Sequence, residues 1–406
     1  MSKRALILKL LQDIRASYWF VPTCLVVVGL LLASGAVWID RHPDWLPFEL
    51  PDRLKNTQAE GARSLLAVIA QATLGVAGVT FSMTLVAVSH ASATFGPRLI
   101  GNFMRDRGNQ YCLGILIATF VYTIMVLRTI QSEAEGDVAA FVPHLAILIA
   151  IGLVMISVFA LIFFIHHVPE TINVSNITST LGHGLQQAVQ RAIDSAEDST
   201  ATATDPEGDP DAICCSTQSG YLQTINFDRL GTLAQENDWH ISLVPAVGDF
   251  LTTATPVLKV WGKDVSDEDM GNLRDCFALG ATRTEAQNPV FLAEQLVEML
   301  GRALSPGVND PYTAIDCLNR MTAALTVAVT YKQGLRTRTL DRITFPSLTF
   351  PRLFAATFPL CRQYILPDDM TRAHAIAALT DLSKVARAED ARLISEELRH
   401  LHGDDA

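Results

Sequence analysis

One apolar segment of the sequence carries an unusual row of polar and glycine residues. Separated by steps of four, three, four and seven, these are Gln71, Gly75, Gly78, Ser82 and Ser89. On a helix such positions fall on one face. Small and hydroxyl-bearing side chains allow helices to pack closely, and the same face can line a water-filled path. The spacing therefore predicts a packing seam, a pore lining, or a seam between subunits that encloses a pore.

A second candidate is the stretch ALSPGVNDPYTA at residues 303–314. Ser-Pro-Gly ends one helix, and Asn-Asp-Pro supplies a cap and a first-turn proline for the next. Capping accounts for these residue types, so we expect a structural joint. As a binding site, the joint would offer a helix N-terminus to an anion or to a subunit contact. The candidate residues are Arg302, Ser305, Asn309 and Asp310.

Other reactive residue types show no pattern of a catalytic or metal site. His90, His166 and His167 lie near expected helix ends. There they could sense pH or bind a metal, although interfacial histidines commonly do neither. The seven cysteines do not have the spacing of a zinc site. Their odd number and scatter are typical of reduced thiols in a cytoplasmic domain, where they fill small apolar spaces. No Walker loop, dinucleotide fingerprint, nucleophile elbow or HExxH motif occurs. We therefore expect no enzymatic activity, catalytic residue, metal or cofactor.

The elements that must position these residues are long and apolar. Four runs, at residues 18–38, 65–88, 111–127 and 142–165, contain almost no charge. About 20 apolar residues in a helix span the hydrocarbon core, and backbone groups in lipid must be satisfied within the segment. The runs predict four transmembrane helices over residues 18–170, after a cytoplasmic segment at 1–17. No carboxylate lies mid-span, which weighs against a secondary transporter.

Basic residues set the expected orientation. The N-terminal segment is basic, and the second connection carries Arg98, Arg105 and Arg107 against Asp106 alone. The third connection, residues 129–141, is acidic and contains no lysine or arginine, although Arg128 lies at its edge. Positive charge favours the cytoplasmic side. We therefore expect both termini in the cytoplasm, with these three arginines at the cytoplasmic mouth of any path.

Residues 171–406 are expected to form a cytoplasmic α+β domain, with a mobile acidic loop near 197–213. The formal net charge of -11 lies largely in this half and argues against nucleic acid as a partner. Residues 247–260 have the look of a turn in a lipoyl-like barrel-sandwich. The expected strands lie at 220–226, 239–247 and 256–261, and the expected helices at 178–195, 227–237, 267–277, 289–304, 311–332 and, at least two, within 352–400.

The chain resembles the bacterial predicted membrane proteins of domain-of-unknown-function family 2254. Six stretches carry the resemblance in order: residues 73–110, 141–147, 163–168, 219–226, 247–251 and 302–314. The resemblance implies a membrane-embedded N-terminal part and a cytoplasmic C-terminal part, and it brings no established activity.

These observations favour a polytopic α-helical membrane protein of the bacterial inner membrane. The function that we expect is a homo-oligomeric channel or pore-like protein, with the lipid bilayer, other copies of the chain and a small ion as partners. The alternative is a non-conducting scaffold or assembly protein, whose cytoplasmic domain recruits a partner.

Overall fold

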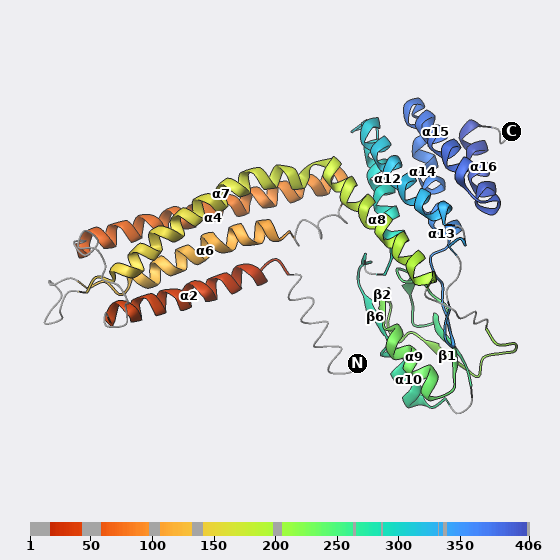
Figure 1. Ribbon diagram of the computed structural model, residues 1–406, viewed down its shortest axis with the longest axis horizontal. Helices are drawn as coiled ribbons and strands as arrows, with labels where there is room; N and C mark the ends of the chain where they lie inside the picture. Colours follow the sequence, from red (N-terminus) through yellow and green to blue (C-terminus); the bar gives the residue numbers. More distant parts are fainter. Residues whose placement is uncertain are drawn as a thin grey trace. The chain divides into compact units, whose positions relative to one another are not determined.

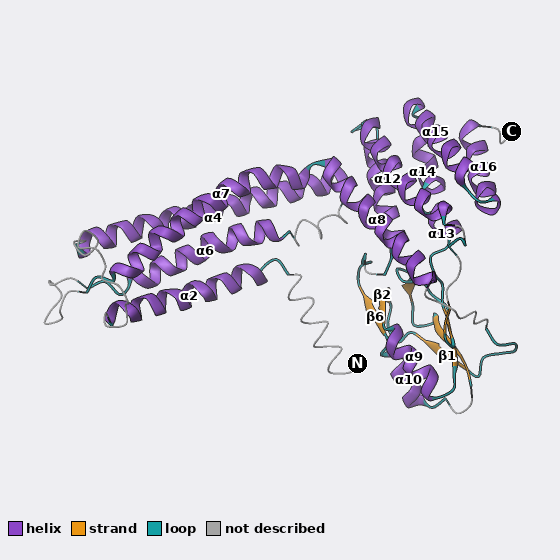
Figure 2. Cartoon of the chain, in the orientation of Figure 1, coloured by secondary structure: helices purple, strands orange, loops and turns teal. Residues whose placement is uncertain are grey.

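The computed structural model describes residues 17–42, 58–96, 106–131, 141–197, 205–262, 265–285, 287–331, 333–335 and 339–403. The chain divides into two compact units, one within Lys3–Asn173 and one formed chiefly by Val174–Ala406 (Figure 1). The first is helical, and the second combines helices with strands (Figure 2).

The first unit contains α2 (Phe20–Arg41), α4 (Ala59–Phe95), α6 (Arg107–Leu127) and α7 (His144–Ile172). Each is long and apolar enough to cross a membrane. The four apolar runs are thus confirmed as helices. Even α6, the shortest of them in its described extent, has 21 residues. At a rise of about 1.5 Å per residue it extends for about 30 Å, the thickness of a hydrocarbon core.

Helix α6 is central to this unit, because it contacts α2, α4 and α7. Its approach to α2 is close. A methyl group at Gly114 would lie 3.0 Å from the Pro22 Cα atom, and one at Gly29 would lie 3.0 Å from the Ala118 carbonyl oxygen. Small residues at these crossings let the two backbones approach, which is how apolar helices pack without a hydrophobic driving force between them.

Polar contacts join the helix ends. The Asp40 carboxylate of α2 accepts hydrogen bonds from the backbone N–H of Leu145 (3.0 Å) and Ala146 (2.9 Å) in the first turn of α7. At the same end, the Arg63 guanidinium donates to the Ile130 carbonyl at 2.9 Å. These contacts join ends of opposite polarity, so the four helices alternate in direction.

The exterior of the unit is apolar. Val86 of α4 is 67% exposed, Phe159 of α7 is 65% exposed and Ile165 is 62% exposed. Exposed apolar surface of this extent marks an interaction with a membrane or a protein. Together with the length of the helices, it is what a lipid-facing surface requires.

The helices of the second unit pack around α12 (Pro311–Thr330), which contacts α8 (Val174–Glu197), α11 (Pro289–Ala303), α13 (Phe350–Ala355) and α15 (Asp369–Val385). Their starts are locally encoded. Asparagine or aspartate side chains accept first-turn N–H groups at α11, α12 and α15, as N-caps do. The remaining helices are α9 (Phe227–Glu236), α10 (Asp267–Arg274), α14 (Phe358–Ile365) and α16 (Ala388–His402).

The strands form two small sheets. The five-stranded sheet has the order β1-β5-β3-β8-β7, and the three-stranded sheet has the order β4-β2-β6. Only β3 and β8 pair in parallel among the pairings within these sheets. The strands are β1 (Ala212–Cys215), β2 (Gly220–Ile225), β3 (His240–Leu243), β4 (Phe250–Leu251), β5 (Pro256–Trp261), β6 (Phe277–Gly280), β7 (Thr339–Leu340) and β8 (Ile343–Thr344).

The acidic segment expected at 197–213 differs from the prediction at both ends. Helix α8 continues to Glu197, and β1 begins at Ala212. Between them, residues 198–204 lie outside the described residues, whereas Asp205 accepts hydrogen bonds from Ser242 (3.1 Å) and Thr344. Asp205 also lies 3.8 Å from His240. Burial lowers the pKa of His240 below its usual value, and the Asp205 carboxylate opposes part of that shift. The end of the acidic segment is therefore attached to the larger sheet.

The Asp40 contact predicts a measurable loss of stability. Asp40→Ala removes the acceptor for the N–H groups of Leu145 and Ala146. Loss of a helix cap of this kind should cost about 1–2 kcal/mol. Asp40→Asn keeps one oxygen acceptor and should cost less. Thermal unfolding of the purified protein in detergent measures both. Ser64→Ala changes an exposed position of α4 and is the control; equal effects of Asp40→Ala and Ser64→Ala would contradict the capping role.

Candidate functional site

The predicted stripe on α4 lies on the outside of the first unit. All five of its residues are exposed, and a methyl group at Gly75 or Gly78 would have nothing within 4 Å. Within the described chain, the stripe is therefore not a seam between helices of one unit. Whether it meets water or a second copy of the chain stays a prediction. The stripe consists of Gln71, Gly75, Gly78, Ser82 and Ser89.

The opposite face of α4 carries buried hydroxyl groups instead. Thr73, Thr80 and Thr84 are 6%, 3% and 5% exposed. Each donates to a carbonyl of its own helix, such as Thr84 to Thr80 at 2.9 Å. Back-bonding of this kind satisfies a hydroxyl without a partner helix. The polar residues of α4 thus divide into an inner, self-satisfied set and the exposed stripe.

At the predicted mouth, Arg107 is exposed in the first turn of α6, while Arg98 and Arg105 lie outside the described residues. The neighbouring Asp106 caps α6 by accepting from the N–H groups of Gly108 and Asn109. Its carboxylate also lies 2.7 Å from the His167 ring of α7. In the sequence, Asp106 stands out only as a counter-charge to the arginines, because the pairing with His167 depends on the tertiary arrangement.

No group of three His, Cys, Asp or Glu side chains that could hold a metal occurs among the described residues. All seven cysteines are free thiols. Burial raises the pKa of Cys276 to about 11, and burial likewise raises the pKa of Cys214, Cys317 and Cys361. Because the thiolate is the reactive form, these buried thiols are poor nucleophiles.

The joint between α11 and α12 is built as a cap, as the sequence predicts. The Asp310 carboxylate accepts from the Thr313 N–H at 3.1 Å and from the Thr313 hydroxyl at 2.5 Å. Asn309 has a positive φ, in the left-handed region that asparagine tolerates well. Ser305 donates to the Arg302 carbonyl at 2.6 Å, and Arg302 pairs with Glu298 at 3.4 Å. These polar groups are occupied by the joint itself.

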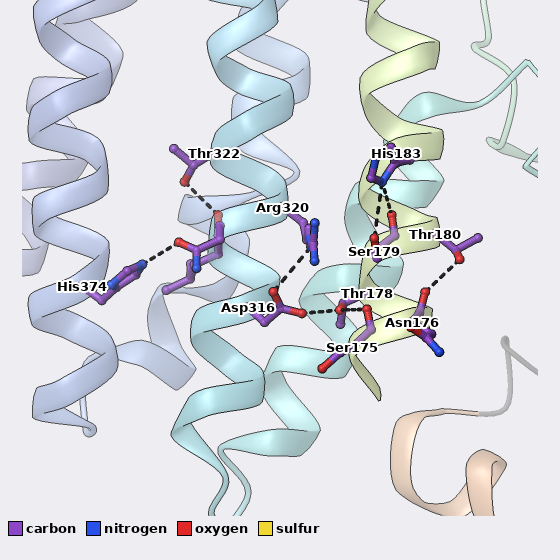
Figure 3. A network of polar contacts seen from close by, with 12 residues as sticks. Ser175, Asn176, Thr178, Ser179, Thr180, His183, Asp316, Arg320, Thr322 and His374 are labelled. Carbon is purple, nitrogen blue, oxygen red and sulfur yellow. Dashed lines mark hydrogen bonds and ion pairs between the residues drawn. The ribbon is translucent and has the colours of Figure 1, made fainter. Parts of the chain in front are cut away.

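A network of polar contacts connects α8 to α12 (Figure 3). Thr178, which is fully buried, donates a hydrogen bond to Asp316, and the Arg320 guanidinium lies 3.4 Å from the same carboxylate. On the far side of α12, the His374 ring lies 2.7 Å from the Asn319 amide oxygen. The network fixes α8 to the helical layer, and no local sequence signal indicated it.

A cavity of about 370 Å³ lies between α8, the segment that leads into α11, and the segment that leads into α13. Its wall is mostly apolar and includes Phe227 and Phe345. Arg191 of α8, Arg352 of α13 and Asn288, the N-cap of α11, also line it. The volume lies within the range of small-molecule sites, roughly 300–1,000 Å³. The residues of the wall come from segments far apart in the chain, and no single motif contains them together, so no local sequence signal indicated the cavity.

The joint yields a prediction about Asp310, whose carboxylate caps α12. Asp310→Ala removes that cap and should cost about 0.5–2 kcal/mol, whereas Asp310→Asn and Asp310→Ser retain an acceptor and should be nearly neutral. Thermal unfolding of the full chain measures all three. If Asp310→Asn were as damaging as Asp310→Ala, the negative charge would matter beyond capping, and an anion-repelling or cation-binding role would replace this account.

Comparison with known proteins shows the family. The family described as predicted membrane protein (DUF2254) matches residues 15–381. Uncharacterized proteins of Mycobacterium bovis and Mycobacterium tuberculosis are each 32% identical over 330 residues, which cover 78% of this chain. The match spans 61% of the length of each relative. No solved structure matches the chain. The protein is therefore a member of the DUF2254 family of predicted membrane proteins.

Proposed function

We propose that the protein is a homo-oligomeric, channel-like protein of the bacterial inner membrane, with α4 facing neighbouring copies. The observation that carries this proposal is the exposed stripe on an otherwise apolar surface. Beside the stripe, Val79 is 59% exposed and Met83 is 57% exposed. An amide such as Gln71 is costly to place in hydrocarbon without a hydrogen-bond partner. A neighbouring subunit or water would supply that partner.

The geometry of α4 suits contact between subunits. Gly75 and Gly78 leave open space outside the unit, so a second helix can approach their backbone closely. Ser82 and Ser89 continue the same face and would donate to carbonyl groups or to water. In a ring of copies, one seam of this kind both joins the subunits and borders the central path.

The path that we propose would carry little fixed charge. Its lining consists of glycine, serine and glutamine, so selectivity would come from charge at its ends. The exposed Arg107, together with Arg98 and Arg105, would raise the local concentration of anions there, an effect that salt screens. We assign the protein no enzymatic activity and no nucleic-acid partner.

Accessibility of single cysteines tests the path. After removal of the native cysteines, Ser82→Cys and Gly78→Cys should react with a water-soluble thiol reagent in intact membranes. Phe81→Cys and Met83→Cys, on the flanking apolar surface, should not react, because a thiol in lipid stays protonated and is inaccessible to the reagent. Purified protein in planar bilayers should show conductance that the same reagent reduces in the Ser82→Cys variant.

Two results would contradict the channel. Protection along the whole stripe, together with absence of conductance, would leave the non-conducting scaffold as the better account. Equal reaction of the stripe positions and the flanking positions would show that the unit is not enclosed by lipid, and the membrane placement itself would be wrong.

The proposed orientation places both termini and the second unit in the cytoplasm, on the basis of the basic second connection. Reporter fusions after Arg107 and after Ala406 should then give a cytoplasmic signal. Fusions after Lys55 and after Asp137 should report the opposite side of the membrane. A cytoplasmic signal from the Asp137 fusion would overturn the arrangement of four spans.

A further inference from the structure

We infer that the cavity beside α8 is a binding site for a small organic anion with an apolar body. The inference is independent of the channel proposal, since the cavity lies wholly within the second unit. Its wall supplies apolar contact from Phe227, Phe345 and Leu292. Some of its polar groups are engaged within the fold, and others have hydrogen-bond donors that remain available to a ligand.

Two polar groups of the wall are engaged within the fold. The Gln287 amide holds both backbone groups of Ile225, at 3.0 Å to the N–H and 3.3 Å to the carbonyl oxygen. Glu285, whose side chain is the one carboxylate among the described residues of the wall, accepts a hydrogen bond from the Asn288 N–H through its backbone carbonyl at 3.3 Å and makes a further interaction. Both groups are therefore committed to the fold, and neither marks the cavity as a site for a cation.

Asn288 fixes the start of α11 in the same wall. It is 2% exposed, and its side-chain oxygen accepts from the Phe291 N–H at 3.2 Å. Its Nδ2 atom is enclosed beside Gly248, where a methyl group would lie 2.1 Å from it. Asn288 therefore shapes the wall as the N-cap of α11, and the donors that a ligand could reach belong to the two arginines.

Both arginines of the wall keep donors available. Arg191 donates through Nε to the Gln187 carbonyl at 3.2 Å, which leaves its terminal nitrogens. Arg352, which is partly exposed, makes no hydrogen bond or ion pair with the parts of the chain that the structure describes. Helix α11 starts at Pro289 in the same wall and adds the positive end of its dipole.

Available donors, set in an apolar wall, fit an acceptor-rich head group on an apolar body. Guanidinium groups bind carboxylate and phosphate through paired hydrogen bonds. The formal net charge of the chain is -11, so the protein as a whole repels anions. A local pair of arginines therefore makes this wall an exception to the surrounding field.

The test measures binding of defined probes to the full chain in nanodiscs of phosphatidylcholine. The probes are 1-naphthyl phosphate and 2-naphthoate, which separate the two head groups, with 1-naphthol as a neutral body and inorganic phosphate as a head alone. Equilibrium dialysis against empty nanodiscs corrects for partition into lipid. We expect saturable binding of at least one naphthyl anion and weaker binding of both 1-naphthol and inorganic phosphate.

Variants connect the binding to the cavity. Arg191→Ala and Arg352→Ala should each raise the Kd of the anion by about tenfold, as loss of a charge-assisted hydrogen bond does. Arg352→Lys should lose less, because it keeps the charge. Ala192→Trp, which fills the cavity from α8, should abolish binding. Arg392→Ala removes the same charge from an exposed position of α16 and should leave the Kd unchanged.

The thermal unfolding temperature of every variant shows whether a loss of binding reflects a loss of fold. Absence of saturable binding for both naphthyl anions in the folded protein would overturn the inference. So would equal affinity for 1-naphthol, or a Kd that Arg191→Ala, Arg352→Ala and Ala192→Trp all leave unchanged.

Discussion

Helices surrounded by hydrocarbon gain little from burying apolar side chains against one another, and the first unit has the packing that this constraint favours. Its buried core combines small residues, such as Ala33 and Ala146, with larger ones, such as Tyr122. Specificity comes from close backbone approach at Gly29 and Gly114 and from polar contacts such as that of Tyr122 with the Ala146 carbonyl at 2.9 Å. Other large apolar groups, such as Val86 and Phe159, lie on the outside of the unit, where lipid would contact them.

The same constraint explains which parts of α4 could be predicted from its sequence. A helical period shows that polar residues share a face, and the stripe from Gln71 to Ser89 was found in this way. The period does not show which face turns inward when both the interior and the surroundings are apolar. Thr73, Thr80 and Thr84 are the buried hydroxyls, and their bonds to their own helix make that burial inexpensive.

In the second unit, local sequence signals were sufficient to predict where several elements begin. The contacts between distant segments could not be predicted from such signals. The cap and proline of α12 are encoded within a few residues, and both α12 and β5 begin where the sequence predicts. The segment predicted as a helix to residue 277 instead ends as α10 at Arg274, and Phe277 begins β6 beside β2. Strand β8 pairs with β3 across about a hundred residues, and the cavity gathers Arg191, Asn288 and Arg352 from segments that are also far apart in the chain. Such contacts depend on the assembled fold.

The cap that Asp40 provides to α7 has a consequence for biosynthesis. The carboxylate and its partner Leu145 are 105 residues apart. At about 5–20 residues per second, roughly 5–20 s of translation separate them. During that interval α2 has been made, and its carboxylate has no backbone partner on α7. The polar contact between these two helix ends can therefore form only after the last helix of the unit has been synthesised.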